Sequence, residues 1–125
     1  MDGRALARVA ELLGAARVAA LPVPGIPRQD APRTIVDGYA AQEALHRYLC
    51  ERTGSNLAGW KIGATTPGMQ AYLGVDGPAY GHILSANVHE AGTVLSASDF
   101  CNPGIECEIA VRIGANAGNR TYIRD

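Results

Sequence analysis

Two glutamates spaced two residues apart form the pair of side chains best suited to chemistry. Glu106 and Glu108 lie in residues 103–113, where every odd position from 105 to 113 is apolar. This alternation predicts a strand with both carboxylates on one face, their backbone positions about 6.5–7 Å apart. Two ionised carboxylates this close repel each other, and a hard divalent cation with oxygen ligands relieves the repulsion. The alternative is an ordinary amphipathic strand whose polar face lies in water.

A lysine between two glycines is the second candidate, in the sequence Gly59-Trp60-Lys61-Ile62-Gly63. On a strand, Gly59, Lys61 and Gly63 share one face, while Trp60 and Ile62 share the other. The missing side chains leave room for a ligand against the backbone, and the lysine could hold an anion, or transfer a proton if its pKa were lowered. We expect Lys61 to face the two glutamates and Trp60 to be buried on the opposite side. The alternative is a surface lysine beside two glycines that serve turns or bulges.

Weaker candidates follow that strand. Thr65, Thr66 and Gln70 could donate hydrogen bonds to a carboxylate, or they could cap the short helix that begins there. The scattered histidines, His46, His82 and His89, are expected to be bystanders, and no partner is evident for His82 or His89.

Composition and charge exclude several classes of protein. The chain has 125 residues, 11 basic and 12 acidic side chains, and a net charge of −1, which gives no electrostatic footprint for nucleic acid. No apolar run approaches the ~20 residues of a membrane span, and charged residues interrupt the apolar N-terminus, which argues against a signal peptide. Three cysteines without metal or CxxC spacing indicate free thiols. We therefore expect a cytoplasmic protein that binds neither nucleic acid nor membrane.

The elements that must position these residues form an α+β pattern of helices followed by strands. Four prolines make residues 21–34 an extended connector between two helices, and the 21 alanines predict a thin core. Thr34 and Asp37 can cap the second helix. The expected elements are helices at residues 4–20 and 34–52, a short helix at 67–73, and strands at 57–65, 80–84, 92–95 and 103–113.

Five segments in this order carry a resemblance to a known family: residues 37–42 (DGYAAQ), 59–65 (GWKIGAT), 69–70 (MQ), 74–81 (GVDGPAYG) and 104–110 (GIECEIA). Over roughly residues 34–113 the chain resembles the 2-keto-4-pentenoate hydratase family. This family includes 4-oxalocrotonate decarboxylases and belongs to the fumarylacetoacetate hydrolase superfamily. The resemblance implies a rolled, mixed β structure preceded by helices. Residues 1–56 would then be the N-terminal helical segment, and residues 57–125 the first, truncated part of the β-roll catalytic domain.

The resemblance also implies roles for the candidate residues. Glu106 and Glu108 fall on two of three acidic ligands of Mg²⁺ or Mn²⁺, and Lys61 falls on the active-site lysine. Thr65 and Gln70 are then candidates for binding the substrate, a short 2-oxo acid. The implied activity is that of a lyase, a hydratase acting on a compound such as 2-hydroxypenta-2,4-dienoate in aromatic catabolism. A homo-oligomer is expected for the full-length enzyme.

Two departures from the family pattern keep other functions open. Ala79 stands where family members commonly carry an acidic residue, so an acid for proton transfer is missing there. Family chains are also much longer, and a third metal ligand is expected some tens of residues beyond Glu108. The alternatives are a 4-oxalocrotonate-type decarboxylase and an inactive N-terminal fragment of such an enzyme. A carbon–carbon bond hydrolase ranks below these, because such an enzyme needs a His-Glu pair and no such pair is evident.

Overall fold

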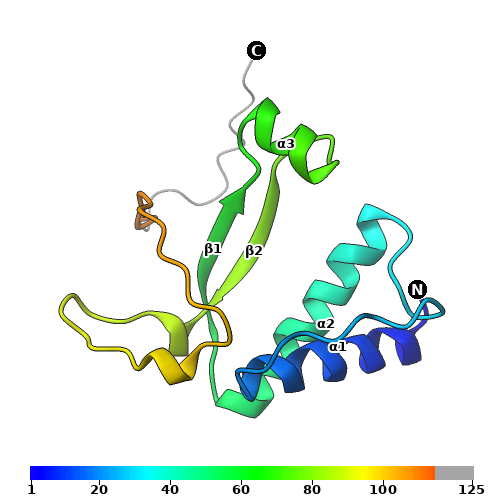
Figure 1. Cartoon of the computed structure of the whole chain (residues 1–125), viewed down its shortest axis with the longest axis horizontal. Coiled ribbons are helices and arrows are strands. Elements are labelled where there is room, and N and C mark those ends of the chain that lie inside the picture. Colours follow the sequence, from blue (N-terminus) through cyan, green and yellow to red (C-terminus); the bar gives the residue numbers. More distant parts are fainter. Residues whose placement is uncertain (115–125) are drawn as a thin grey trace.

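The computed structural model describes residues 1–114 and has the α+β composition expected from the sequence (Figure 1). Its regular elements are α1 (Gly3–Val18), α2 (Ile35–Thr53), β1 (Leu57–Gly63), α3 (Pro67–Leu73) and β2 (Ala79–Leu84), followed by two single-turn 3₁₀ helices at Ser85–Asn87 and Ala97–Asp99. Among the described helices, none is both long and apolar enough to span a membrane.

The two long helices pack together through small side chains. The buried residues of α1 are Ala5, Val9, Ala10, Gly14 and Ala16. The extended connector predicted at residues 21–34 brings the chain back alongside α1 to the start of α2 (Figure 1). An ion pair ties this connector to α1, because Arg8 donates to the buried carboxylate of Asp30 through Nε at 3.0 Å and Nη2 at 2.5 Å. The hydrogen bonds from Arg8 hold the pKa of Asp30 below its usual range.

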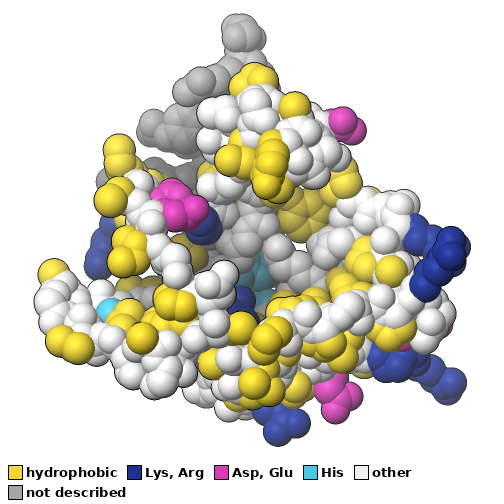
Figure 2. Space-filling model, viewed as in Figure 1, with side chains coloured by type: hydrophobic (Ala, Val, Ile, Leu, Met, Phe, Trp, Pro, Cys, Tyr) yellow, Lys and Arg dark blue, Asp and Glu magenta, His cyan; other side chains and the backbone are white. Residues whose placement is uncertain are grey.

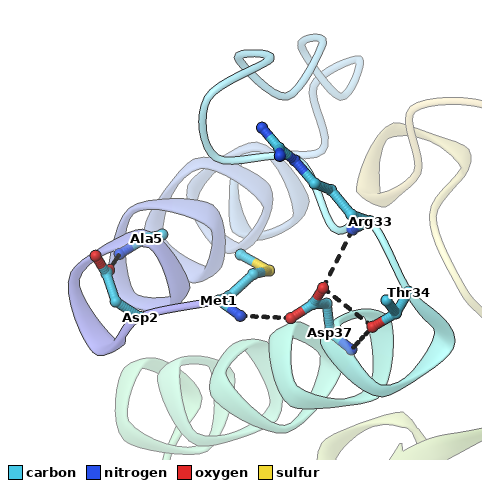
Figure 3. A network of polar contacts seen from close by, with 6 residues as sticks. All are labelled: Met1, Asp2, Ala5, Arg33, Thr34 and Asp37. Atoms are coloured by element: carbon cyan, nitrogen blue, oxygen red, sulfur yellow. Dashed lines mark hydrogen bonds and ion pairs between the residues drawn. The ribbon is translucent and has the colours of Figure 1, made fainter.

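The start of α2 is fixed by a polar network that includes the N-terminus (Figure 3). The Thr34 hydroxyl accepts from the backbone N–H of Asp37 at 3.1 Å and donates to the carboxylate of Asp37 at 3.0 Å. That carboxylate also accepts from the Met1 ammonium and from the N–H of Arg33. The Met1 ammonium, and then Thr34, lower the pKa of Asp37. The predicted cap is therefore present, and it is tied to the beginning of α1.

The hairpin of β1 and β2 is the described part of the sheet, and α3 lies at the end where the two strands connect (Figure 1). The strands are antiparallel, with Trp60 opposite His82, Lys61 opposite Gly81, and Ile62 opposite Tyr80. Residues paired in this way share a face of the sheet. The aromatic face contacts α2, where Tyr39 stacks on Tyr80 with ring centroids 4.3 Å apart. Helix α2 thus packs against this face of the hairpin.

The prediction of two further strands is wrong. Residues 92–95 and 103–113 form no strand in the described structure, because a strand needs a neighbour that takes up its backbone hydrogen bonds. The apolar side chains of the second segment are accordingly in solvent, with Ile105 98% and Ile109 95% exposed. The described sheet has two strands, and the β-roll remains a prediction. The predicted catalytic domain extends into residues 115–125, which lie outside the described residues.

The fold leaves an unusually large surface in contact with water. The chain exposes 10275 Å² of accessible surface, whereas a compact monomer of 13.1 kDa exposes about 6400 Å². Figure 2 shows hydrophobic side chains spread over the face in view, both on the helices and on the segment that follows β2. The thin core expected from the many alanines is consistent with this exposure.

Candidate active site

Lys61 lies in the middle of β1, on the face of the hairpin that does not carry Trp60. Its neighbours on that face include Gly59 and Gly63 along β1 and Gly81 across the hairpin. A Cβ at Gly63 would meet nothing within 4 Å, and one at Gly59 would reach only the Cδ1 atom of Ile83, at 4.0 Å. The glycines therefore leave open space beside the lysine side chain, most clearly at Gly63.

The ammonium of Lys61 contacts both candidate metal ligands. Its Nζ donates to Oε1 of Glu108 at 2.6 Å and to Oε2 of Glu106 at 3.3 Å. Hydrogen bonds to Glu108, and then to Glu106, raise the pKa of Lys61 above its usual range. Lys61 is therefore a cation at neutral pH, and it balances part of the negative charge of the two carboxylates.

The two glutamates reach the same point although their segment is not a strand. In an extended chain alternate side chains project to the same side, and Glu106 and Glu108 converge on one ammonium. Their side chains are 73% and 55% exposed, and that of Lys61 is 50% exposed. The arrangement has room for a ligand from solvent.

The carboxylates of Glu106 and Glu108 supply only part of the ligands that a hard cation needs. Two convergent carboxylates supply the oxygen ligands that Mg²⁺ and Mn²⁺ prefer. Within residues 1–114, however, no group of three or more His, Cys, Asp and Glu side chains could hold a metal ion. Glu106 and Glu108 would therefore be part of a ligand set that has to be completed by other oxygen atoms.

The weaker candidates have other contacts. Gln70 donates through Nε2 to the carbonyl of Ala64 at 2.8 Å and so holds the turn between β1 and α3. Thr66 caps α3, because its hydroxyl accepts from the N–H of Met69 at 3.3 Å. Thr65 is exposed. Within the described residues, no hydrogen bond joins Thr65 or Gln70 to Lys61, so their role in substrate binding remains a prediction.

A histidine pair that was not predicted from the sequence lies between α2 and the hairpin. The rings of His46 and His82 lie 4.2 Å apart, and the ring of Trp60 lies 4.4 Å from that of His82. Nε2 of His82 lies 3.7 Å from Oε2 of Glu43, and Nε2 of His46 lies 3.5 Å from Sγ of Cys50. The expectation that His82 lacks a partner is therefore wrong. The spacing of Glu43, His46 and Cys50 along one helix face was the available signal.

Trp60 was expected to be buried, and this is also wrong, since it is 54% exposed. It does lie on the face opposite Lys61, where its ring is 5.5 Å from that of Tyr80.

A groove of about 470 Å³ opens on the Tyr80 side, between the start of α2 and residues 75–80. Tyr39, Asp76 and Ala79 are among its lining residues. This groove is lined by neither Lys61 nor the two glutamates.

Similarity to proteins of known activity agrees with the family predicted from the sequence. No family model matches the chain. "2-keto-4-pentenoate hydratase 2" of Dechloromonas aromatica is 38% identical over 77 residues, which are 61% of this chain and 29% of that protein. "4-oxalocrotonate decarboxylase" of Pseudomonas putida is 36% identical over 78 residues, 62% of this chain and 29% of the relative. "2-oxo-hept-4-ene-1,7-dioate hydratase" of Escherichia coli is 38% identical over 77 residues, which are 62% of this chain and 28% of that protein.

The matched stretch spans less than a third of the length of these relatives. Within that limit the resemblance is confirmed. Over about 60% of its own length, the chain is similar to 2-keto-4-pentenoate hydratases and 4-oxalocrotonate decarboxylases.

Proposed function

We propose that this chain contributes to the active site of a metal-dependent lyase, a hydratase acting on a short unsaturated 2-oxo acid such as 2-hydroxypenta-2,4-dienoate. The observation that carries the proposal is the convergence of Glu106, Glu108 and Lys61. The names of the relatives, hydratases and decarboxylases, support the same reaction class. We also propose that the hairpin is the beginning of the fumarylacetoacetate hydrolase-like β-roll.

Each of the three side chains has a defined task in this proposal. Glu106 and Glu108 would hold Mg²⁺ or Mn²⁺ together with other oxygen ligands. When bound, the ion would supply a Lewis acid for the negative charge that develops on the 2-oxo oxygen. Lys61, half exposed beside the two glutamates, would supply a positive charge that holds an anionic substrate.

A decarboxylase is the second candidate, and Ala79 favours it. Ala79 begins β2 opposite Gly63, and it places a methyl group where the resembled family commonly has an acid. Hydration requires addition of water and a side chain that takes a proton from the water and returns one to the substrate. Loss of CO₂ from a second carboxylate, one that is conjugated with the 2-oxo group, leaves its electron pair as an enolate on the 2-oxo oxygen; this enolate needs stabilisation, but no activated water is required. The relative named 4-oxalocrotonate decarboxylase is consistent with this alternative.

The setting of the enzyme is part of the proposal. Cys50, Cys101 and Cys107 are free thiols, which fits a reducing compartment, and we place the protein in the cytoplasm. The large exposed apolar surface supports assembly into a homo-oligomer, because such surfaces are usually covered by a partner.

Mn²⁺ binding tests the metal site directly. In calorimetric titrations we expect Glu106→Gln to weaken Mn²⁺ binding about tenfold or more, since even changes around a metal site commonly cost that much. Glu90→Gln is the matched control, because it removes the same charge from an exposed glutamate outside the site. Equal Mn²⁺ affinities of the two variants would contradict the metal site.

Activity is tested separately with 2-oxo acid substrates and Mg²⁺ or Mn²⁺, with a chelator as the metal-free control. Hydration and decarboxylation are followed in parallel, so that the two candidate reactions are distinguished. We expect residues 1–125 alone to be without substantial activity, because two carboxylates leave the ion mostly hydrated and poorly fixed. Turnover of about 1 s⁻¹ or more would refute this expectation.

A further inference from the structure

We propose that Lys61 is an internal competitor of the metal ion, so that its contact with Glu106 and Glu108 and the binding of a divalent cation there exclude each other. This inference rests on the proposed function, and it assigns Lys61 a role in metal loading in addition to its role toward substrate. Lys61 would be released from the glutamates when the ion binds.

The distances support mutual exclusion. The ammonium lies 2.6 Å from one carboxylate oxygen of Glu108 and 3.3 Å from one of Glu106. A magnesium ion bound by these carboxylates needs oxygen atoms at about 2.0–2.1 Å. Both cations would be drawn to the same point between the two side chains, where their like charges repel each other. The ammonium thus holds the position that the ion would take.

Within the described residues, Lys61 is the counter-ion of Glu106 and Glu108. It is the only lysine of the chain, and within the described residues it is the only cation that forms an ion pair with either glutamate. In the absence of metal it relieves the repulsion between two neighbouring carboxylates. The metal must offset the loss of both contacts in order to bind.

The exchange requires no rearrangement of the backbone. The Lys61 side chain is half exposed, and its glycine neighbours leave open space beside it. The ammonium can therefore swing away from the carboxylates into solvent or toward a bound anion. Loading of the metal would then free a positively charged donor next to the ion, where the carboxylate of a 2-oxo acid could accept from it.

Mn²⁺ affinities of three proteins test the competition. We expect Lys61→Gln to bind Mn²⁺ about two- to thirtyfold more tightly than the unsubstituted chain, the range that two exposed ion pairs contribute. Arg112→Gln is the matched control, since it removes a positive charge four residues after Glu108 in the chain, and the described residues show no ion pair between Arg112 and the glutamates. We expect its affinity to change by less than about twofold, because exposed charges that are not in contact are screened.

The outcomes separate the inference from the proposed function. If the unsubstituted chain binds Mn²⁺ and Lys61→Gln binds no more tightly than Arg112→Gln, the competition is refuted and the metal site stands. If the unsubstituted chain and Lys61→Gln both fail to bind Mn²⁺, the metal site is refuted and the inference falls with it.

A second measurement uses the unsubstituted chain and does not depend on whether a variant folds. A carbodiimide condenses an amine with a carboxylate in contact to give an amide, and the chain offers only Lys61 and the N-terminal amine. Without metal we expect a cross-link from Lys61 to Glu106 or Glu108, mapped by mass spectrometry. Saturating Mn²⁺ should suppress it, while the cross-link between Met1 and Asp37, which are also in contact, should persist. A Lys61 cross-link unchanged by Mn²⁺ would overturn the proposal.

Discussion

Gly14 allows α1 to pack directly against the Tyr48 ring of α2, and the substitution Gly14→Ala tests this contact. A Cβ at this position would lie 2.5 Å from Cε1 and 3.2 Å from Cγ of Tyr48, and closer still to Cδ1. Carbon atoms in good contact are about 3.5–4.0 Å apart, so the ring or the helix must move. Overpacking of this kind costs about 1–3 kcal/mol, whereas alanine gains about 0.8–1 kcal/mol over glycine inside a helix. We therefore expect the free energy of unfolding to fall by about 1 kcal/mol.

Gly38 provides the matched control in α2. A Cβ there would meet nothing within 4 Å, so Gly38→Ala keeps the gain in helix propensity without the overlap. We expect this variant to be more stable by up to about 1 kcal/mol. Urea unfolding followed by far-UV circular dichroism measures both changes. If Gly14→Ala stabilises the chain as much as Gly38→Ala does, the close contact between α1 and Tyr48 is absent and the reasoning is refuted.

Two further substitutions test the contacts that fix the start of α2 and the connector. Thr34→Ala removes the hydroxyl that accepts from the N–H of Asp37, and we expect it to lower the free energy of unfolding by about 1 kcal/mol in the same urea experiment. Asp30→Asn removes the carboxylate whose pKa is lowered by Arg8. Its stabilising effect is present above the ordinary carboxyl pKa and is lost as the pH falls through the lower pKa of the folded state. Stability measured against pH should therefore be lower for Asp30→Asn at neutral pH, and the difference should shrink below about pH 4. An unchanged difference at low pH would contradict this assignment.

The helices could be predicted closely because their signals are local. Thr34 caps α2 and Thr66 caps α3, both through side chains that lie within the same turn as their partners. Gly54 ends α2 with a positive φ of 65° that suits glycine. The prolines of the connector exclude helix through their own backbone chemistry. None of these effects depends on a distant part of the chain.

The strand at residues 103–113 could not be predicted in the same way. Alternation determines the side to which each residue projects, but it does not determine whether another strand is available to pair with. The part of the prediction that depends on projection alone was sound, since Glu106 and Glu108 converge on Lys61. The part that depends on pairing was wrong, because the segment forms no strand.

The histidine pair could not be predicted for the same reason, because its contacts depend on how distant segments pack together. The contact of His82 with Glu43 arises when α2 packs on β2. The spacing of Glu43 and His46 indicates a shared helix face, but it does not indicate which strand residue that face contacts. The exposure of Trp60 also depends on packing, because one helix covers only part of the hairpin face on which Trp60 lies. Its position on the face opposite Lys61 was predicted from strand alternation, but the described residues cover too little of that face to bury it.

The large exposed surface of this chain determines how it should unfold. An unfolded chain of this mass exposes about 19000 Å², so folding to a surface of 10275 Å² removes about 70% of the area that a compact domain of the same size removes. The heat capacity change of unfolding and the denaturant slope both scale with this area. We expect a heat capacity change of about 1.1–1.3 kcal/mol/K instead of about 1.5–1.9. The urea transition should be correspondingly broad, and a partner that covers the exposed apolar side chains should sharpen it.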